Sequence, residues 1–214
     1  MDNTVTLEDI KYIKMIIGAD VYKCKISSYK DEIRFIDHIQ RKVLDAAPVD
    51  KTLLYESERE PKDLYIAKHG LCYDRSRVIE KILTAAGFNT RHIVIFKNPE
   101  KTHPLVRIFD IQKHASHAVT EVQTLKGWLV VDSNEGFISI NETEDPFSIR
   151  MMSNYARKGI PIRWKNCYQD NYNVLFEDNF IFVYGLYSRH GDFYPPYNFV
   201  PDINWAEFLQ NFTG

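Results

Sequence analysis

One change of hydrophobic period constrains this chain more than any other feature of its sequence. In the segment CYDRSRVIEKILTAAGF, apolar residues recur at helical spacing, and one face carries Val78, Ile79, Ile82, Leu83 and Ala86. Gly87 follows, where glycine commonly ends a helix. The next apolar runs, TRHIVIF, HAVTEVQTL and GWLVVDS, are rich in β-branched and aromatic residues, as is the later FIFVYGLYS. This order predicts an α+β fold in which a central helix starting at Cys72 packs on an antiparallel sheet.

The rest of the chain extends this core without a sign of a second domain. A helix is predicted for KDEIRFIDHIQRKVLDAAP, which Pro48 ends, and a short last helix for WAEFLQNF, after the extended aromatic stretch RHGDFYPPYNFVPDINW. The sequence contains no internal repeat and no Gly/Ser-rich linker. We therefore predict a single domain over residues 1–214, with a helical part at 1–64, a core at 65–140 and an aromatic-rich extension at 141–214.

The overall charge gives the chain no electrostatic preference for a partner. Lys and Arg number 27 against 29 Asp and Glu, for a net charge of -2 at pH 7. We therefore expect neither nucleic acid nor a membrane as a partner, and the oligomeric state stays open. No run reaches the roughly 18 apolar residues of a membrane span, and the N-terminal segment lacks the apolar stretch of a secretory signal. Three cysteines without C-x-x-C spacing suit a reducing compartment, so we predict a cytoplasmic protein.

Cys72 lies where an activated thiol is favoured. In the first turn of a helix, the free backbone N–H groups and the positive end of the helix dipole favour the thiolate over the thiol, and the same N–H groups can hold an oxyanion. Gly70 lets the backbone turn tightly into this helix. Cys72 is therefore a candidate nucleophile, and histidine is the side chain best suited to protonate a leaving amine.

His117 and Asp132 are the candidates that complete such a site. His117 begins the predicted strand HAVTEV, and Asp132 ends the next one, GWLVVD. If these strands form a hairpin around Lys126 and Gly127, the start of the first strand faces the end of the second, which brings Asp132 beside His117. A carboxylate there accepts the imidazole N–H and fixes its tautomer. The three residues therefore predict a catalytic triad of Cys72, His117 and Asp132.

These segments resemble the motifs of the transglutaminase-like superfamily. HGLCYDRS and the helix that ends in AAGFNTR look like its cysteine motif, and SHAVTEV and GWLVVDSNEGF look like its histidine and aspartate motifs, over about Tyr65 to Ile140. The resemblance implies a papain-like α+β core, thioester chemistry and an upstream side chain that helps to hold the oxyanion, for which Tyr55 and Tyr65 are candidates by position. We predict no cofactor and no metal.

Three positions depart from well-known members of that family. Leu71 stands where animal transglutaminases have Gln, Tyr73 where they have Trp, and Val119 where Trp usually follows His-Ala. Arylamine N-acetyltransferases share the order of cysteine, histidine and aspartate, but KHG replaces the Arg-Gly-Gly that precedes their cysteine. The resemblance therefore does not imply cross-linking activity.

We predict a thiol-dependent amide hydrolase, either a peptidase or an amidase, that acts on a peptide or protein amide through a thioester on Cys72. The first alternative is an acyltransferase such as a transglutaminase, in which an amine replaces water. The second alternative is a catalytically inactive interaction domain that retains the three residues.

Two motifs allow a metal site as a competing interpretation. His114, His117 and Cys72 could bind zinc, although a triad explains Asp132 better. The segment DSNEG, which begins at Asp132, faintly resembles a calcium loop, but its twelfth position is Thr143 rather than an acid. A turn after the catalytic aspartate is the favoured interpretation.

The remaining polar and aromatic features have weaker functional readings. Cys24 and Cys167 lack partner motifs and are expected to be incidental thiols. His69 could contact substrate or serve packing. The basic segment RKGIPIRWKNCY could bind phosphate groups, but a solvated loop is favoured for its charges, Arg157, Lys158, Arg163 and Lys165. The aromatic stretch from Tyr184 to Trp205 could line an acyl pocket or cover the core.

Overall fold

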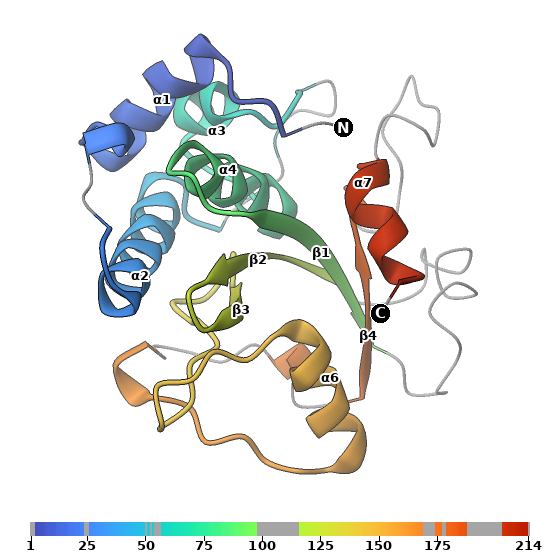
Figure 1. Ribbon diagram of the computed structural model, residues 1–214. Helices are drawn as coiled ribbons and strands as arrows, with labels where there is room; N and C mark the ends of the chain where they lie inside the picture. Colours follow the sequence, from blue (N-terminus) through green and yellow to red (C-terminus); the bar gives the residue numbers. More distant parts are fainter. Residues whose placement is uncertain are drawn as a thin grey trace.

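A four-stranded antiparallel sheet forms the centre of the molecule (Figure 1). Its spatial order is β3-β2-β1-β4. The strands are β1 (Thr90–Lys97), β2 (Ser116–Thr124), β3 (Gly127–Val131) and β4 (Phe180–Tyr184). The computed structural model describes residues 3–23, 26–49, 51, 53, 57–97, 116–168, 174–176, 179–187 and 203–213.

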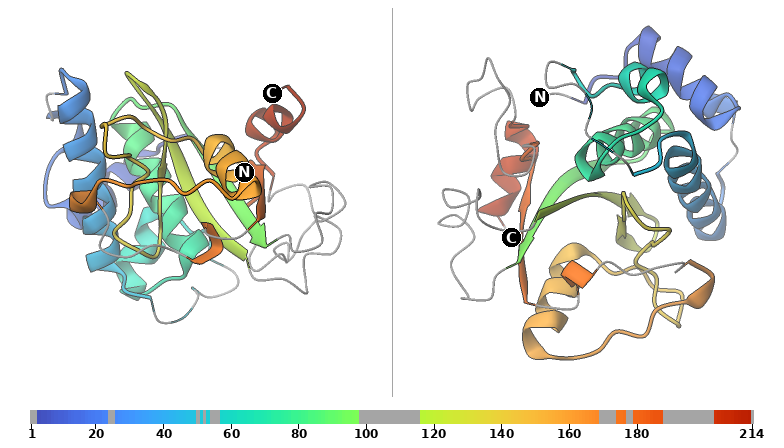
Figure 2. Two further views of the ribbon diagram at one scale, coloured as in Figure 1. Left: turned by 90° about the horizontal axis from the view of Figure 1, so that it is seen from below. Right: turned by 180° about the vertical axis from the view of Figure 1, so that it is seen from behind.

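Four helices cover one face of this sheet (Figures 1 and 2). The central one, α4 (Cys72–Ala85), packs on β2 and β1, and every residue in it except Thr84 is buried. The others, which pack around α4, are α1 (Leu7–Ile17), α2 (Tyr29–Ala46) and α3 (Pro61–Ala67). The side chains of Thr6 and Ser28 accept backbone N–H groups at the starts of α1 and α2, as helix N-caps do.

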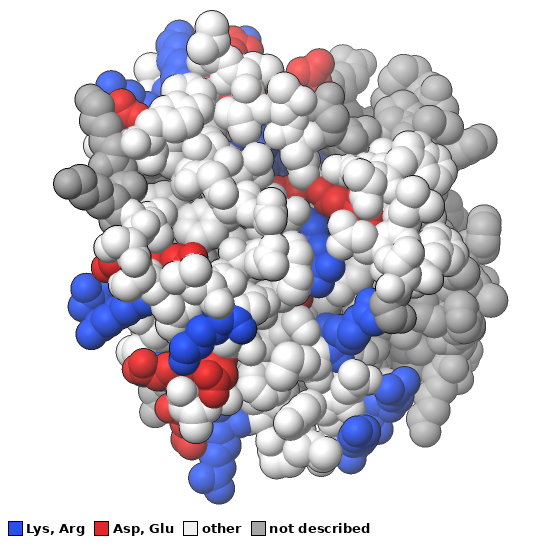
Figure 3. Space-filling model, viewed as in Figure 1, with Lys and Arg blue, Asp and Glu red and all other residues white. Residues whose placement is uncertain are grey.

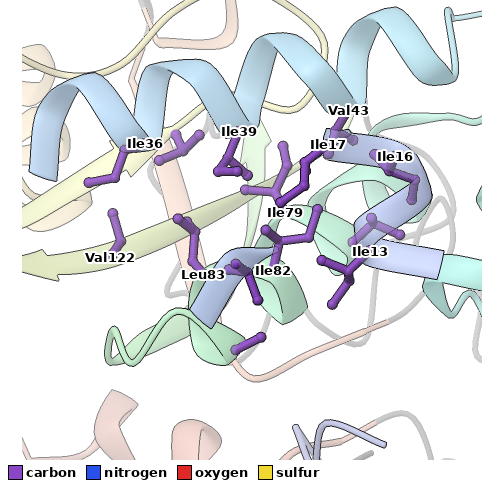
Figure 4. Close-up of a cluster of buried hydrophobic side chains, with 14 of the residues drawn as sticks. Ile13, Ile16, Ile17, Ile36, Ile39, Val43, Ile79, Ile82, Leu83 and Val122 are labelled. Atoms are coloured by element: carbon purple, nitrogen blue, oxygen red, sulfur yellow. The ribbon is translucent and has the colours of Figure 1, made fainter. Parts of the chain in front are cut away.

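The main hydrophobic core lies between these helices and the sheet (Figure 4). Ile79, Ile82 and Leu83 on the apolar face of α4 meet isoleucines of α1 and α2 and Val122 of β2. All of the α4 side chains in this cluster except Ala85 are fully buried, so the face predicted from the sequence is the face that packs. Burying each Leu or Ile side chain stabilises a fold by about 1.5–3 kcal/mol.

Two further helices, each with a short 3-10 turn beside it, cover other parts of the sheet. The helix α6 (Ile149–Lys158) and a short 3-10 turn (Val174–Phe176) lie on the opposite face, where Ile93, Val119 and Val130 meet Phe176 and Met152. The C-terminal helix α7 (Trp205–Phe208), with the 3-10 turn Leu209–Asn211, packs against β4. Short 3-10 turns at Val21–Lys23 and Asn166–Tyr168 complete the described secondary structure. Of the described helices, none combines the length and the apolarity that a bilayer crossing requires.

The predicted α+β class, its central helix and its strands are confirmed. The helices α1 and α3 were not predicted individually, and α6 was not predicted at all. Helix α6 was missed although its apolar residues Ile149, Met152 and Tyr155 recur at helical spacing and pack on the sheet. Its end signals are also present, since Ser148 accepts the N–H of Met151 and Gly159 ends the helix with a φ of 64°. Most of the predicted extended stretch 189–205, namely residues 189–202, lies outside the described residues.

Candidate active site

Cys72 is the first residue of α4 and belongs to a small buried cluster. Its exposed fraction is 9%, and it packs with Tyr73 and Ala118. The buried Asp74 carboxylate accepts the backbone N–H of Leu71 at 3.0 Å, and thereby fixes the entry into the helix. The first N–H groups of any helix lack partners within that helix, so those at the start of α4 are directed toward the region of the thiol.

Gly70 is required here for space rather than for an unusual backbone angle. Its φ is not in the left-handed range, unlike that of five other glycines. A side chain at this position would place its Cβ 2.8 Å from Cδ1 of Leu64 and 3.2 Å from Cβ of Asp74. The chain therefore passes so close to α3 on its way into α4 that only glycine fits without a shift.

His117 and Asp132 lie together at the ends of the two strands expected to carry them. The ladder between β2 and β3 runs from Thr120 to Thr124, so His117 lies just before it, and Asp132 follows β3 directly. Nε2 of His117 is 3.0 Å from each carboxylate oxygen of Asp132. Both side chains are buried, with exposed fractions of 2% and 0%.

A tight turn holds the Asp132 carboxylate in place. Its Oδ1 accepts the backbone N–H groups of Asn134 at 2.6 Å and Glu135 at 3.0 Å. Although burial raises the pKa of Asp132, the His117 charge and these hydrogen bonds outweigh it, and the pKa of Asp132 is lowered. The segment expected to form a turn rather than a calcium loop therefore binds the carboxylate with its own backbone.

Gln40 of α2 supports the same turn, and no pattern in the sequence predicts this contact. Its Nε2 donates to the carbonyl oxygens of Asp132 at 2.7 Å, Glu135 at 3.0 Å and Phe137 at 2.7 Å. Gln40 is completely buried on the core face of its helix. A polar residue among apolar neighbours can be assigned a partner only once the fold brings that partner near.

The electrostatics of the site favour a protonated His117. Burial lowers the pKa of its imidazole, but the charge and hydrogen bond of Asp132 raise it, and so do a hydrogen bond and charge interaction with Cys72. The pKa of His117 is raised to about 10 as a result. Since Nε2 is held by Asp132, Nδ1 is the nitrogen left for Cys72.

Phe176 closes the site on the α6 side. Its ring meets the edge of the His117 ring at a centroid distance of 6.4 Å. The same ring lines a cavity of about 440 Å³, whose other walls are Met152, Ala156, Gly159, Ile160, Pro161, Ile162 and Trp164. The cavity is within the size range of ligand pockets and lies one aromatic ring away from His117.

Other residues singled out in the sequence lie elsewhere or outside the described chain. The Tyr65 ring is tilted against that of Tyr12, with centroids 5.8 Å apart, and lies beneath the Lys68 ammonium at 3.6 Å, on the α1 side of the molecule. Nδ1 of His69 lies 3.0 Å from the carbonyl oxygen of Lys51. Cys167 is exposed. Tyr55, Cys24 and His114 are not among the described residues.

The basic segment is divided between α6 and the strand-like chain that follows it. Arg157 and Lys158 form the last turn of α6, while Lys165 pairs with Glu144, and Arg163 lies 4.0 Å from Glu142. In Figure 3, basic side chains gather at the lower right, over α6, and are mixed with acidic ones at the lower left. Within the part of the chain that the structure describes, no three His, Cys, Asp or Glu side chains cluster as metal ligands would.

The family model for the transglutaminase-like superfamily matches residues 22–133. That range covers more than half of the chain and includes Cys72, His117 and Asp132. The chain belongs to the transglutaminase-like superfamily. Domains of this superfamily are usually enzymes, and membership supports a cysteine-dependent hydrolase or acyltransferase at this coarse level. No curated protein matches the chain.

The family match reaches further toward the N-terminus than the motifs do. The matched range begins within the short turn before α2, well upstream of the motifs, and ends one residue after Asp132. The superfamily therefore accounts for α2, α3, α4 and the first three strands, while α6, β4 and α7 lie outside the matched range.

Proposed function

We propose that this transglutaminase-like chain is a thiol-dependent amide hydrolase in which Cys72 is the nucleophile, His117 transfers the proton and Asp132 orients His117. One observation carries the proposal. The buried His117 ring has Nε2 at 3.0 Å from both Asp132 oxygens, and Cys72 acts on the same ring, where it raises the pKa of His117. This is the order of nucleophile, base and orienting group that triads require.

The reaction begins from a thiolate and an imidazolium. The Cys72 thiolate attacks the carbonyl carbon of an amide, and the oxygen takes the negative charge near the N–H groups at the start of α4. His117 gives its proton to the nitrogen as the C–N bond breaks, which releases the amine and leaves a thioester. His117 then takes a proton from water as the water oxygen attacks the thioester. The acid leaves, and the thiolate and imidazolium are restored.

The raised pKa of His117 supports its role as the acid of the first step. A side chain whose pKa is about 10 is protonated at neutral pH and is ready to donate to the amine. The cavity bounded by Phe176 offers an apolar side chain of a peptide or protein substrate a place beside the same histidine. Both features fit an amide of a peptide or protein.

The reactivity of Cys72 tests this proposal. In a chain that carries Cys24→Ser and Cys167→Ser, iodoacetamide can alkylate only Cys72. At about pH 6 we expect alkylation to be roughly a hundredfold faster than that of glutathione, because a free thiol with a pKa of about 8.5 is barely ionised there. His117→Ala is expected to reduce the rate toward that of glutathione. His38→Ala, on the exposed face of α2, is the matched control and leaves the rate unchanged.

A Cys72 that reacts no faster than glutathione and ignores His117→Ala would exclude both enzyme interpretations and favour an inactive interaction domain. The acyltransferase alternative has its own readout. A labelled primary amine offered together with a glutamine-containing protein is incorporated by a transglutaminase. We expect release of ammonia or amine without incorporation.

A further inference from the structure

Arg75 is a buried cation placed one helical turn after Cys72. It lies in α4 and has an exposed fraction of 1%. Four acidic or thiol groups interact electrostatically with its guanidinium: Cys72, Asp132, Asp74 and Glu135. Residues three positions apart share one face of a helix, so the guanidinium and the thiol lie on the same side of α4.

The hydrogen bonding of this guanidinium is sparse for a buried charge. Its Nη2 donates to Oδ1 of Asn134, and Asn134 donates its own backbone N–H to Oδ1 of Asp132. Among the residues that the structure describes, the buried Nε has no hydrogen-bond partner. Structural arginines in protein interiors are usually satisfied on several nitrogens, and a buried charge is costly unless it is paired.

The attraction of the guanidinium to negatively charged groups therefore offsets the free-energy cost of burying the Arg75 charge. Burial lowers the pKa of the guanidinium, and the charges of Cys72 and Asp132 act against that effect in this order. An attraction between two groups is mutual, so a cation held here favours the ionised form of the thiol. Asn134 fixes the side chain in this position, because it is bound to the Asp132 turn.

We propose that Arg75, held in place by Asn134, is a positioning residue of the site that stabilises the thiolate form of Cys72. This inference rests on the proposed function, since it assigns Arg75 a role in activating the same nucleophile. Arg75 connects the helix that carries Cys72 with the turn that carries Asp132 through its charge rather than through packing. Among the described residues, the strongest charge interactions of Arg75 are with the four groups already named, and His117 contacts one of them, Asp132.

The pH dependence of Cys72 alkylation tests the role of Arg75. The rate with iodoacetamide is measured from about pH 4 to about pH 9 in the chain that carries Cys24→Ser and Cys167→Ser. We expect Arg75→Gln and Arg75→Met to move the midpoint of the profile upward by about one pH unit or more, because each removes the positive charge. Arg75→Lys keeps the charge and is expected to restore most of the shift. Asn134→Ala is expected to give a smaller shift in the same direction.

Arg41→Gln is the matched control, since Arg41 is a partly exposed arginine that pairs with Asp37 on α2.

A merely structural arginine would change stability in all three Arg75 variants without moving the midpoint. A reactive Cys72 whose midpoint is the same in the parent chain, Arg75→Gln and Arg75→Lys overturns the inference and leaves the proposed function intact. If Arg75→Met does not fold, Arg75→Gln, Arg75→Lys and Asn134→Ala still decide the result. A Cys72 that behaves as a free thiol in the parent chain overturns both.

Discussion

Two buried histidines show how single contacts decide protonation in this molecule. His92 and His117 are both buried, yet the pKa of His92 is lowered well below its ordinary value while that of His117 is raised to about 10. Burial lowers the pKa of both, and Arg59 and Arg77 lower that of His92 further. His92 stacks on Tyr187 at 4.1 Å, whereas His117 has a carboxylate at 3.0 Å. Burial favours a neutral imidazole at both positions, and the Asp132 carboxylate reverses that effect at His117.

Replacing Asp132 with asparagine should therefore bring His117 toward the behaviour of His92. Asp132→Asn removes the charge but retains the shape, and we expect the pKa of His117 to fall by about 1–3 units or more. Titration of the imidazole nitrogens by NMR measures this, with His92 as the internal control that does not change. Because the folded-state pKa of His117 is raised, His117 adds stability that is fully present below about pH 6.5 and is lost as the pH rises toward 10. The pKa of Asp132 is lowered, so its own contribution is lost at low pH instead. An unchanged His117 titration in Asp132→Asn would show that Asp132 is not the cause.

Among the elements, helix α2 holds in place the turn that follows β3, the strand at one edge of the sheet. Gln40 projects from α2 and reaches three carbonyl oxygens between Asp132 and Phe137. The buried charged residues of α4 act similarly, since Lys81 meets Asp9 of α1 at 2.9 Å, and Arg77 meets Glu60 before α3 at 3.0 Å. The helical layer is therefore joined by polar contacts as well as by its apolar core.

Gln40→Leu should uncouple α2 from the Asp132 turn. Leucine fits the volume but leaves the carbonyls of Asp132 and Glu135 buried without this donor, at a cost of about 1–3 kcal/mol in the free energy of unfolding. His38→Leu, two residues earlier on the exposed face of the same helix, is the control and should change stability by less than about 0.5 kcal/mol. Urea denaturation measures both, and equal effects of the two substitutions would contradict a clamping role for Gln40.

At the scale of the whole molecule, the two ends of the described chain meet over α4. Nδ2 of Asn3 lies 2.7 Å from carboxylate oxygens of both Glu80 and Glu207, which come from α4 and α7. The Tyr187 hydroxyl donates to Glu80 at 2.8 Å. Burial raises the pKa of both carboxyls, and the charge of Glu80 raises that of Glu207 further. Because the pKa of Glu207 is raised to about 9, we expect the pair to hold a proton at neutral pH and this proton to tie α7 to the central helix.

This pair should make stability fall as the pH rises. A carboxyl whose pKa is raised in the folded state adds stability below its unfolded pKa and loses it as the pH rises through the folded value, by up to about 1.4 kcal/mol per pH unit. Glu207→Gln imitates the protonated form, so the variant should lose less stability than the parent chain between about pH 5 and about pH 8. Glu142→Gln, an exposed carboxylate, is the control. Parallel pH profiles for the parent chain and Glu207→Gln would rule out the shared proton.

Local sequence patterns were enough to predict the central helix, the strands and the contact between His117 and Asp132. Each of these depends on a local pattern: a 3.6-residue period in α4, β-branched runs in β1 to β3, and the turn that sets the register between β2 and β3. That turn lies at Leu125 and Lys126, one residue before the predicted position at Lys126 and Gly127. Because the register follows from that turn, His117 and Asp132 could be expected to meet before the fold was known.

Only the tertiary structure decided which polar residues support that site. Gln40 lies 92 residues from Asp132, Arg75 lies 59 from Asn134, and Asn3 lies 204 from Glu207 in the sequence. No periodicity relates such positions, because a polar side chain shows no preference for a partner until burial removes water as the alternative. The polar side of α4, which would face solvent in an isolated amphipathic helix, is buried here because the N-terminal segment, α3 and the C-terminal helix supply its partners.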